Sequence, residues 1–194
     1  MQDDAELRNV ERWVAAARKG DSTAFGELVR TYQSRVYNLL YQIVRHAEDA
    51  RELAQQSWLK AWNKLDTFKG ESSFYSWVYR IATRTALDFL RSRKRAPQVE
   101  FLDQMDPEHH SEQGKLPGRL GRPDEDAQRG EVMRRFQDAL AKLPEIHRTA
   151  LVLREIEGLS YEEIAEAMDC RIGTVMSRLF HARRAIQNHL KDLI

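Results

Sequence analysis

The 194-residue sequence is poor in cysteine and contains no long apolar run. Its single cysteine, Cys170, excludes a framework of internal disulfides. No window approaches the roughly 18 uncharged apolar residues that a membrane-spanning helix needs. The sequence opens Met-Gln-Asp-Asp-Ala-Glu, without the basic and then apolar order of a secretory leader. We therefore expect a protein of the reducing cytoplasm that does not insert directly into a membrane.

The sequence also lacks an excess of charge of one sign, because 31 Lys and Arg side chains oppose 30 Asp and Glu side chains. The net charge of +1 therefore says little about binding partners. No stretch alternates apolar and polar residues with a period of two, so strands are not expected. Apolar residues recur at helical spacing instead, which predicts an all-α protein.

Proline is rare outside one segment, residues 96–130, which holds four of the five prolines, four glycines, and eight acids against four bases. A segment of this composition buries too little apolar area to offset its chain entropy, so we expect a flexible linker. The sequence therefore predicts two small helical domains, residues 1–95 and 131–194, joined by this linker.

Four helices are expected in the first domain, over about residues 5–18, 22–43, 47–65 and 73–95. Gly20 ends the first helix, and Asp21 or Ser22 caps the second. Ser72 or Ser73 caps the fourth, after a loop at residues 66–71. In the second domain helices resume at about residue 131, with breaks at Pro144 and Gly158.

The second domain contains the pattern of two short helices joined by a tight turn. Ser160 and Glu163 have the spacing of a capping box, and Ile164, Ala165 and Met168 follow on one helical face. The turn at residues 169–173 contains a lone apolar residue, Ile172, which we expect to fill the corner. A second helix follows, with a buried row at Val175, Leu179, Ala182 and Ile186. This pattern predicts a helix-turn-helix that places its second helix in the major groove of DNA.

The charge of this second helix agrees with that prediction. Residues 171–191 contain five Lys and Arg side chains and no acid, whereas the helix before it carries Glu162, Glu163 and Glu166. A cationic helix is suited to contact phosphates. The alternative is a solvated C-terminal helix whose cations complement the helix dipole.

A second basic segment lies in the first domain. Residues 69–95 contain seven basic side chains against two acids, with aromatic residues interleaved. Aromatic rings beside cations are typical of sites that bind unstacked bases. The alternative is that the rings belong to the core, which we favour for Phe74, Trp77 and Phe89. Phe68 is a large apolar residue in a charged loop, so for this ring we favour a functional role over a place in the core.

Two blocks of sequence resemble the extracytoplasmic-function sigma factors of bacterial RNA polymerase. Residues 49–62 and 65–82, which include Leu-Asp-Thr-Phe-Lys-Gly-Glu-Ser-Ser-Phe, resemble their region 2. Residues 158–186 resemble their region 4, with Gly-Leu-Ser-Tyr-Glu-Glu-Ile-Ala and Gly-Thr-Val-Met-Ser-Arg blocks. The resemblance implies a non-catalytic initiation subunit that binds polymerase core and promoter DNA, needs no cofactor or metal, and is held inactive by an anti-sigma factor.

The resemblance also implies three groups of functional residues. Region 2 would dock on the clamp coiled coil of the largest polymerase subunit through Glu52, Leu53, Gln55, Gln56 and Leu59. It would open the −10 element and hold a flipped base with Thr67, Phe68, Lys69, Gly70, Tyr79, Arg80, Arg84 and Thr85. Region 4 would contact the −35 element with Arg171, Thr174, Ser177, Arg178, His181 and Arg183.

The linker is long enough for both DNA contacts. Promoter elements about 17 base pairs apart are separated by roughly 60 Å of helix axis. A linker of about 30 residues reaches at most ~100 Å. The two domains could therefore occupy both elements on one polymerase, and tethering would raise the effective concentration of each.

Two other classes of protein compete with this interpretation. A two-domain helix-turn-helix regulator would bind duplex DNA alone as a dimer, but it would not need the basic and aromatic segment at 66–95. A metal enzyme could use His109 and His110 beside Glu108, but no further ligands stand at set spacing. For Cys170 we expect the role of a small buried residue.

Overall fold

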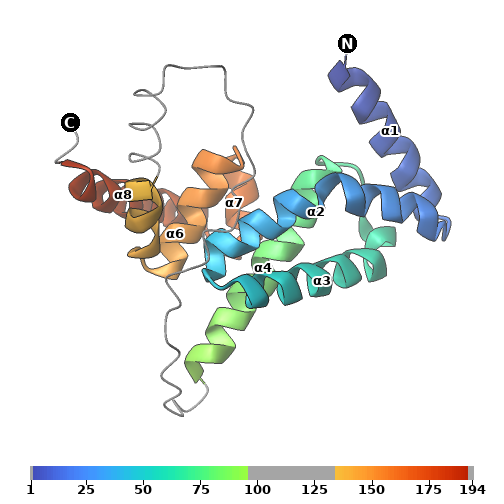
Figure 1. The fold of residues 1–194 in the computed structure, drawn as a ribbon. Coiled ribbons are helices and arrows are strands. Elements are labelled where there is room, and N and C mark those ends of the chain that lie inside the picture. The colour runs from blue at the N-terminus through green and yellow to red at the C-terminus, as the bar shows by residue number, and fades with distance from the viewer. Residues whose placement is uncertain (1, 96–133, 192–194) are drawn as a thin grey trace, which may run out of the picture.

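The computed structural model describes residues 2–95 and 134–191, and every regular element in these two segments is helical (Figure 1). The first segment contains α1 (Gln2–Ala17), α2 (Ser22–Val44), α3 (Ala47–Asn63), the 3-10 turn η1 (Leu65–Thr67) and α4 (Phe74–Arg95). In the second, residues 134–141 are helical and precede α6 (Glu145–Leu151), the π-helical turn η2 (Val152–Ile156), α7 (Tyr161–Ala167) and α8 (Ile172–His189). The all-α prediction is confirmed. The predicted linker, with His109 and His110, lies outside the described residues.

Several helices begin at the caps that the sequence predicts. Asp21 caps α2, and its Oδ1 accepts hydrogen bonds from the backbone N–H groups of Thr23 and Ala24 at 2.9 and 3.1 Å. Ser73 Oγ accepts from the N–H of Ser76 at 3.0 Å at the start of α4. These side chains pair backbone donors that lack a partner within the helix.

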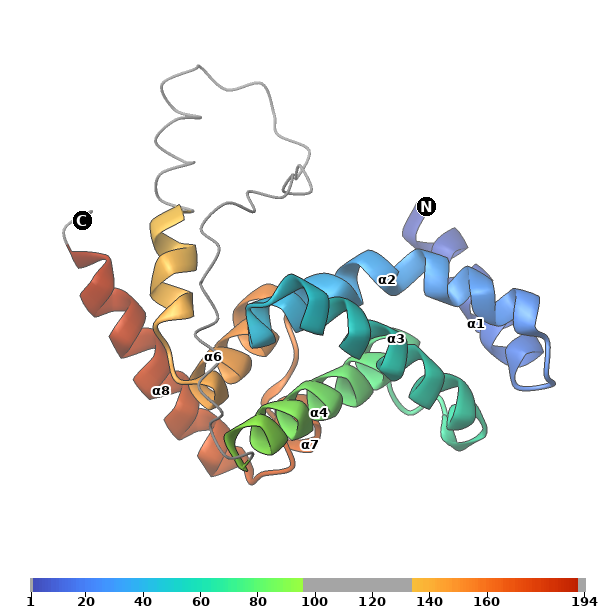
Figure 2. The same cartoon turned by 60° about the horizontal axis from the view of Figure 1, so that its bottom comes forward.

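The core of the first segment lies where α2, α3 and α4 pack together. Fully buried apolar side chains line the predicted inner faces of these helices, namely Leu28, Val36, Leu39, Leu40, Ile43, Ala50, Ala61, Val78 and Ala82. In both views α1 packs beside α2 at one end of the molecule, and α8 lies at the other end (Figures 1 and 2).

The second segment forms the predicted helix-turn-helix. The capping box is present, because Ser160 Oγ accepts from the N–H of Glu163 and the Glu163 carboxylate accepts from the N–H of Ser160. The four residues predicted as the inner row of α8 are buried. Asp169 has a φ of 49°, a left-handed conformation that Asp tolerates, and it turns the chain between α7 and α8.

Two local predictions in this segment need correction. Ile172 does not fill the corner, because α8 begins at this residue and its side chain points outward with 42% of its surface exposed. The helix expected to run to Ile156 changes to η2 after Leu151, where the N–H of Glu157 donates to Val152 O at 3.1 Å. Cys170 is half-buried, and the Arg178 guanidinium lies 3.4 Å from its sulfur.

The two segments pack against each other, with α4 beside α7 and α2 beside α6 (Figure 2). Arg148 of α6 is buried at this contact. Its guanidinium donates to Ile43 O in the last turn of α2 at 2.6 Å, and to Leu143 O and Ala141 O at 3.2 and 3.3 Å. Burial lowers the pKa of Arg148, yet the carbonyls around the guanidinium compensate the charge with hydrogen bonds. Arg148 therefore joins the C-terminal end of α2 to the second segment.

We expect Arg148→Met to lower the free energy of unfolding by about 1–3 kcal/mol, because it leaves buried carbonyl oxygens without a donor. Urea denaturation of the full chain, followed by circular dichroism, measures this loss. Arg12→Met, at an exposed position of α1, is the matched control and should leave stability unchanged. Equal stability of the two variants would contradict the joining role of Arg148.

Candidate nucleic-acid interface

The outward face of α8 presents most of the predicted −35 residues. Thr174, Ser177 and His181 are exposed at helical spacing opposite the buried row, and Arg171 is exposed just before the helix begins. A recognition helix uses its N-terminal residues to contact base edges. Arg171, Thr174 and Ser177 are therefore accessible to duplex DNA, whereas the His181 ring is exposed but stacks on that of His147, with centroids 5.8 Å apart.

The two remaining predicted contacts, Arg178 and Arg183, are already engaged within the protein. Arg178 is half-buried beside the sulfurs of Met168 and Cys170. Arg183 donates to Glu155 Oε1 from Nε at 3.0 Å and from Nη2 at 2.6 Å, and this hydrogen bonding raises its pKa. In this conformation Arg183 ties α8 to η2, and its contact with the −35 element stays a prediction.

Sequence reasoning missed an apolar pair on the same helix. Met176 and Phe180 are four residues apart and largely exposed, with 60% of Phe180 accessible. Both lie outside the buried row at residues 175, 179, 182 and 186. Their positions could therefore have identified them in the sequence as exposed apolar residues. Apolar side chains on a groove-facing helix can contact the methyl group of thymine.

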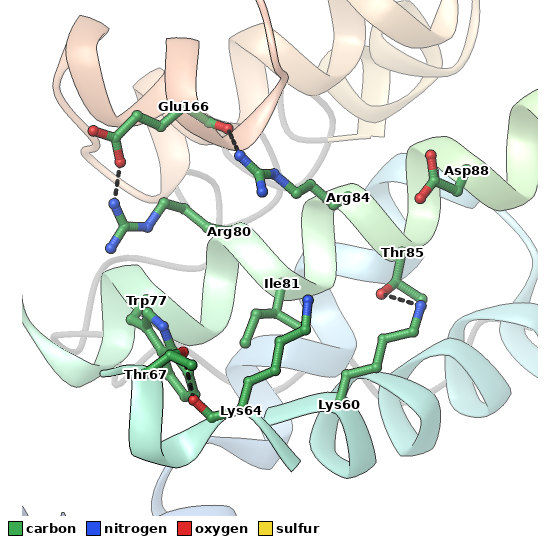
Figure 3. Close-up of a pocket in the computed structure, with 10 residues that line it drawn as sticks. All are labelled: Lys60, Lys64, Thr67, Trp77, Arg80, Ile81, Arg84, Thr85, Asp88 and Glu166. Carbon is green, nitrogen blue, oxygen red and sulfur yellow. Dashed lines mark hydrogen bonds and ion pairs between the residues drawn. The ribbon is translucent and has the colours of Figure 1, made fainter. Parts of the chain in front are cut away.

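A cationic cavity of about 500 Å³ lies along α4 (Figure 3). It brings together four of the predicted −10 residues, namely Thr67, Arg80, Arg84 and Thr85. Lys60 and Lys64 add two cations that the sequence analysis did not assign, and Lys60 Nζ donates to Thr85 Oγ1 at 3.0 Å. Lys60 and Lys64 are four residues apart at the end of α3, so their spacing could have indicated that both side chains lie on the same face. The cavity can accept a polyanion.

Two predicted −10 residues, Phe68 and Tyr79, have buried rings in this structure. Phe68 is 8% exposed and packs edge-on against Phe74, with ring centroids 5.8 Å apart, and against Trp77 at 5.3 Å. Phe68 follows η1 in an extended conformation, and the Phe68 N–H donates to Leu65 O at 3.2 Å. With the backbone in this conformation, the ring points into the core. Tyr79 is fully buried on the inner side of α4. Neither ring can touch DNA unless it leaves the core.

The other two residues of that loop remain accessible. Lys69 and Gly70 are exposed, and Gly70 has a φ of 80°, a conformation that favours glycine. This loop, next to the rim of the cavity, therefore offers a ligand backbone groups and a Lys side chain, and not an aromatic ring.

The predicted polymerase-binding residues on α3 are exposed, except for one. Glu52, Gln55 and Gln56 are accessible, and Leu59 is 63% exposed. Leu53 is buried in the core, so its predicted contact with a partner is wrong. Leu59 is a large apolar side chain on an otherwise polar surface, and a partner that covers it would remove this apolar area from water.

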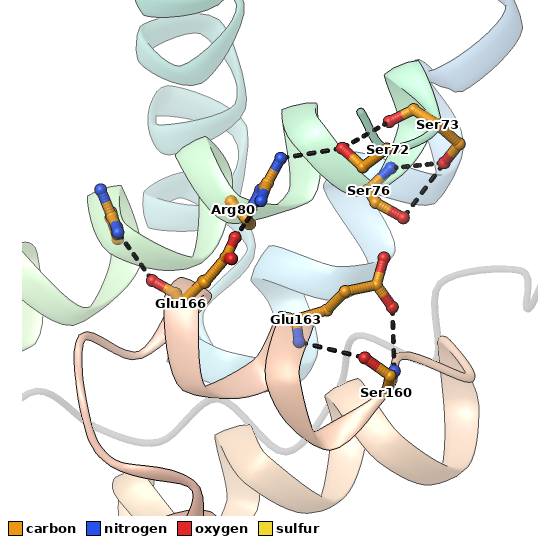
Figure 4. Close-up of polar contacts among 8 residues, drawn as sticks. Ser72, Ser73, Ser76, Arg80, Ser160, Glu163 and Glu166 are labelled. Atoms are coloured by element: carbon orange, nitrogen blue, oxygen red, sulfur yellow. Dashed lines mark hydrogen bonds and ion pairs between the residues drawn. The ribbon is translucent and has the colours of Figure 1, made fainter. Parts of the chain in front are cut away.

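The cationic side of α4 faces the second segment of the chain. Arg80 Nη1 forms an ion pair with Glu166 Oε2 of α7, while Arg80 Nη2 donates to Ser72 Oγ at 2.8 Å (Figure 4). Arg84 Nη2 donates to the backbone oxygen of Glu166 at 2.7 Å. The predicted −10 arginines therefore meet an acid of region 4 in this conformation.

Within residues 2–95 and 134–191, no cluster of three or more His, Cys, Asp or Glu side chains could hold a metal ion. No helix in these residues is long and apolar enough to cross a membrane.

We expect Phe68→Ala to destabilise the protein by about 3–5 kcal/mol, because it removes a buried ring from an aromatic cluster. Thermal and urea unfolding of the full chain measure this effect. Lys69→Ala, one residue further along the loop, is the control and should change stability little. If Phe68→Ala were as stable as the control, the ring would not belong to the core.

Comparisons with known proteins agree with both halves of the fold. The sequence profile of Sigma-70 region 2 matches residues 28–96, and that of Sigma-70 region 4 matches residues 133–186. The ECF RNA polymerase sigma-E factor of Haemophilus influenzae is 40% identical over 190 residues, which cover 98% of this chain and 100% of that protein. The RNA polymerase sigma-H factor of Pseudomonas aeruginosa is 39% identical over 184 residues, which cover 95% of each chain.

Solved structures have the same fold. The sigma factor RpoE of Bartonella quintana, solved with the anti-sigma factor NepR, has a TM-score of 0.64 and 26% identity over 86% of this chain and 96% of that one. CnrH, solved with the cytosolic domain of CnrY, has a TM-score of 0.63 over 95% of this chain and 98% of that one, at 23% identity. The chain therefore belongs to the ECF family of RNA polymerase sigma factors, the non-catalytic initiation subunits that direct the polymerase to promoters.

Proposed function

We propose that α8 reads the −35 element of a promoter while the cationic side of α4 and the loop before it bind the −10 element. The observation that carries this proposal is the outward face of α8, where Arg171, Thr174, Ser177 and His181 are exposed in a segment without acids. Arg171 contributes charge, and the three shorter side chains reach base edges.

The −10 contact would use the cavity along α4. Lys60, Lys64, Arg80 and Arg84 surround a space large enough for a nucleotide, and their charges attract the phosphates of a separated strand. Trp77 also lines the cavity, so an aromatic surface is present beside the cations. Melting needs no chemical step from the protein, since a pocket that binds an extruded base offsets the cost of unstacking it.

We further propose that α3 docks on polymerase core through Glu52, Gln55, Gln56 and Leu59, with Leu59 as the apolar anchor. The functional units would be residues 1–95 and 131–194, joined by a flexible linker at 96–130. The matched ranges of the two sigma profiles, 28–96 and 133–186, support this division. The protein would act in the cytoplasm, where the polymerase and promoters are found.

An anti-sigma factor is the proposed regulator. Two solved structures of similar fold were determined as complexes, one with the anti-sigma factor NepR and one with the cytosolic domain of CnrY. The exposed Leu59, Met176 and Phe180 give this chain apolar surface on both halves, which a partner that inhibits both functions could cover.

Transcription in vitro tests the proposal directly. Purified core with this chain should give promoter-dependent transcripts from a genomic library of the source organism, and mapping their start sites would yield both DNA elements. Core alone should give none. If the chain bound palindromic duplex DNA tightly by itself but supported no core-dependent transcript, the protein would be a helix-turn-helix regulator instead.

We expect Leu59→Asp to weaken binding to polymerase core by about tenfold or more, because it replaces an apolar anchor with a charge. Fluorescence anisotropy with labelled chain and unlabelled core measures the affinity. Gln33→Asp, an exposed position on α2 with the same change in charge, is the control. Equal affinities of the two variants would remove Leu59 from the docking surface.

We expect Arg171→Ala to weaken holoenzyme binding to the −35 element. If Arg171 contacts a phosphate, the slope of log K against log salt should become shallower by about 0.9. Lys142→Ala, at an exposed position outside α8, should leave affinity and slope unchanged. The same loss in both variants would show an unspecific effect of charge.

A further inference from the structure

We propose that region 4 masks the −10 surface in the free protein, with Glu166 of α7 taking the place of DNA phosphate on Arg80 and Arg84. The inference rests on the proposed role of α4 in binding the −10 element. It assigns to this chain an intramolecular contact that excludes DNA until the two regions separate.

The contact involves the two arginines in different ways. Arg80 is held between Glu166 Oε2 on one side and Ser72 Oγ on the other. Arg84 donates to the backbone oxygen of Glu166 in the last turn of α7, an oxygen that also accepts from the N–H of Asp169 at 3.4 Å (Figure 3). Both arginines are therefore directed at one residue of region 4.

A carboxylate is a good substitute for phosphate at this place. Both groups present oxygen acceptors that a guanidinium recognises through charge-assisted hydrogen bonds. Glu166 also forms part of the wall of the cationic cavity, which is lined otherwise by residues of the first region. A DNA strand that enters the cavity must therefore compete with the Glu166 side chain.

Two more acids of region 4 extend the contact along α4. Tyr75 Oη donates to the Glu157 carboxylate near the start of the helix, and Lys94 forms an ion pair with Glu145 near its end. Burial and the hydrogen bond to Glu157 raise the pKa of Tyr75, so this hydroxyl stays protonated and can donate. Acids from three elements of region 4 thus cover a helix whose exposed side is basic.

The masking contact is weak enough to be reversible. Glu166 is 59% exposed, and exposed ion pairs contribute little to stability. Arg148 keeps two of its three carbonyl partners, those of Ala141 and Leu143, when region 4 moves away, because both belong to the same region. Binding to polymerase and DNA could therefore open the contact without unfolding either region.

Substitution of Glu166 in the full chain tests the proposal. Glu166→Gln removes one ion pair, and Glu166→Arg adds repulsion from Arg80 and Arg84. Asp138→Asn and Asp138→Arg are matched controls, because Asp138 is an exposed acid in the helical residues 134–141 of the same region and does not line the cavities beside Arg80 and Arg84. Separation is read by energy transfer between dyes at Lys19→Cys and Gln187→Cys in a Cys170→Ala background. Affinity is read by anisotropy with the single-stranded −10 element mapped by transcription.

We expect Glu166→Gln to raise the affinity for −10 single strand by about two- to fivefold, and Glu166→Arg by about tenfold with a clear loss of energy transfer. The Asp138 controls should change neither quantity. Addition of the −10 strand to the unsubstituted chain should also lower energy transfer.

Unchanged affinity and unchanged transfer in Glu166→Arg would overturn the masking proposal. So would saturation with −10 strand at full energy transfer, because DNA and region 4 would then occupy α4 together. The role of α4 itself is tested separately by an Arg80→Ala, Arg84→Ala double variant in core-dependent transcription. Loss of −10-dependent transcripts there supports the proposed function whatever the Glu166 variants show.

Discussion

The structure depends on α4, a helix that contributes one side to the core and the other side to a basic surface. Its inner side carries Val78, Tyr79 and Ala82, which are fully buried against α2 and α3, and its outer side carries Arg80 and Arg84. Because the inner side fixes the helix in the core, the outer arginines are held at a set place on a rigid element. Function on this surface therefore requires no mobile loop to order first.

The same helix explains why the two halves of the chain meet. A basic surface that is built to bind a polyanion attracts any acidic surface tethered nearby, at a high effective concentration. Region 4 separates its charges, with acids on α7 and near η2 and cations on α8. When its acidic side meets α4, the exposed face of α8 is left accessible to DNA. One contact can thus mask the proposed −10 surface and leave the proposed −35 surface open.

Much of this architecture could be predicted from periodicity and capping. The buried row of α8, the Ser160 capping box and the Asp21 cap follow from local rules, and the structure confirms them. What could not be predicted is the direction of single side chains. Phe68 stands in a charged loop, yet its ring turns inward because Phe74 and Trp77 offer a buried surface that lies several residues away in sequence. Arg183 is engaged by Glu155, an acid 28 positions earlier that only tertiary structure brings close.

A structure of the chain with polymerase core and promoter DNA, determined by electron cryomicroscopy, would test the central claim most directly. Our account predicts that α7 has left α4, that Arg80 and Arg84 contact phosphates of the −10 strand, and that α8 lies in the major groove of the −35 element. A complex in which Glu166 still pairs with Arg80 while the −10 strand binds elsewhere would contradict it.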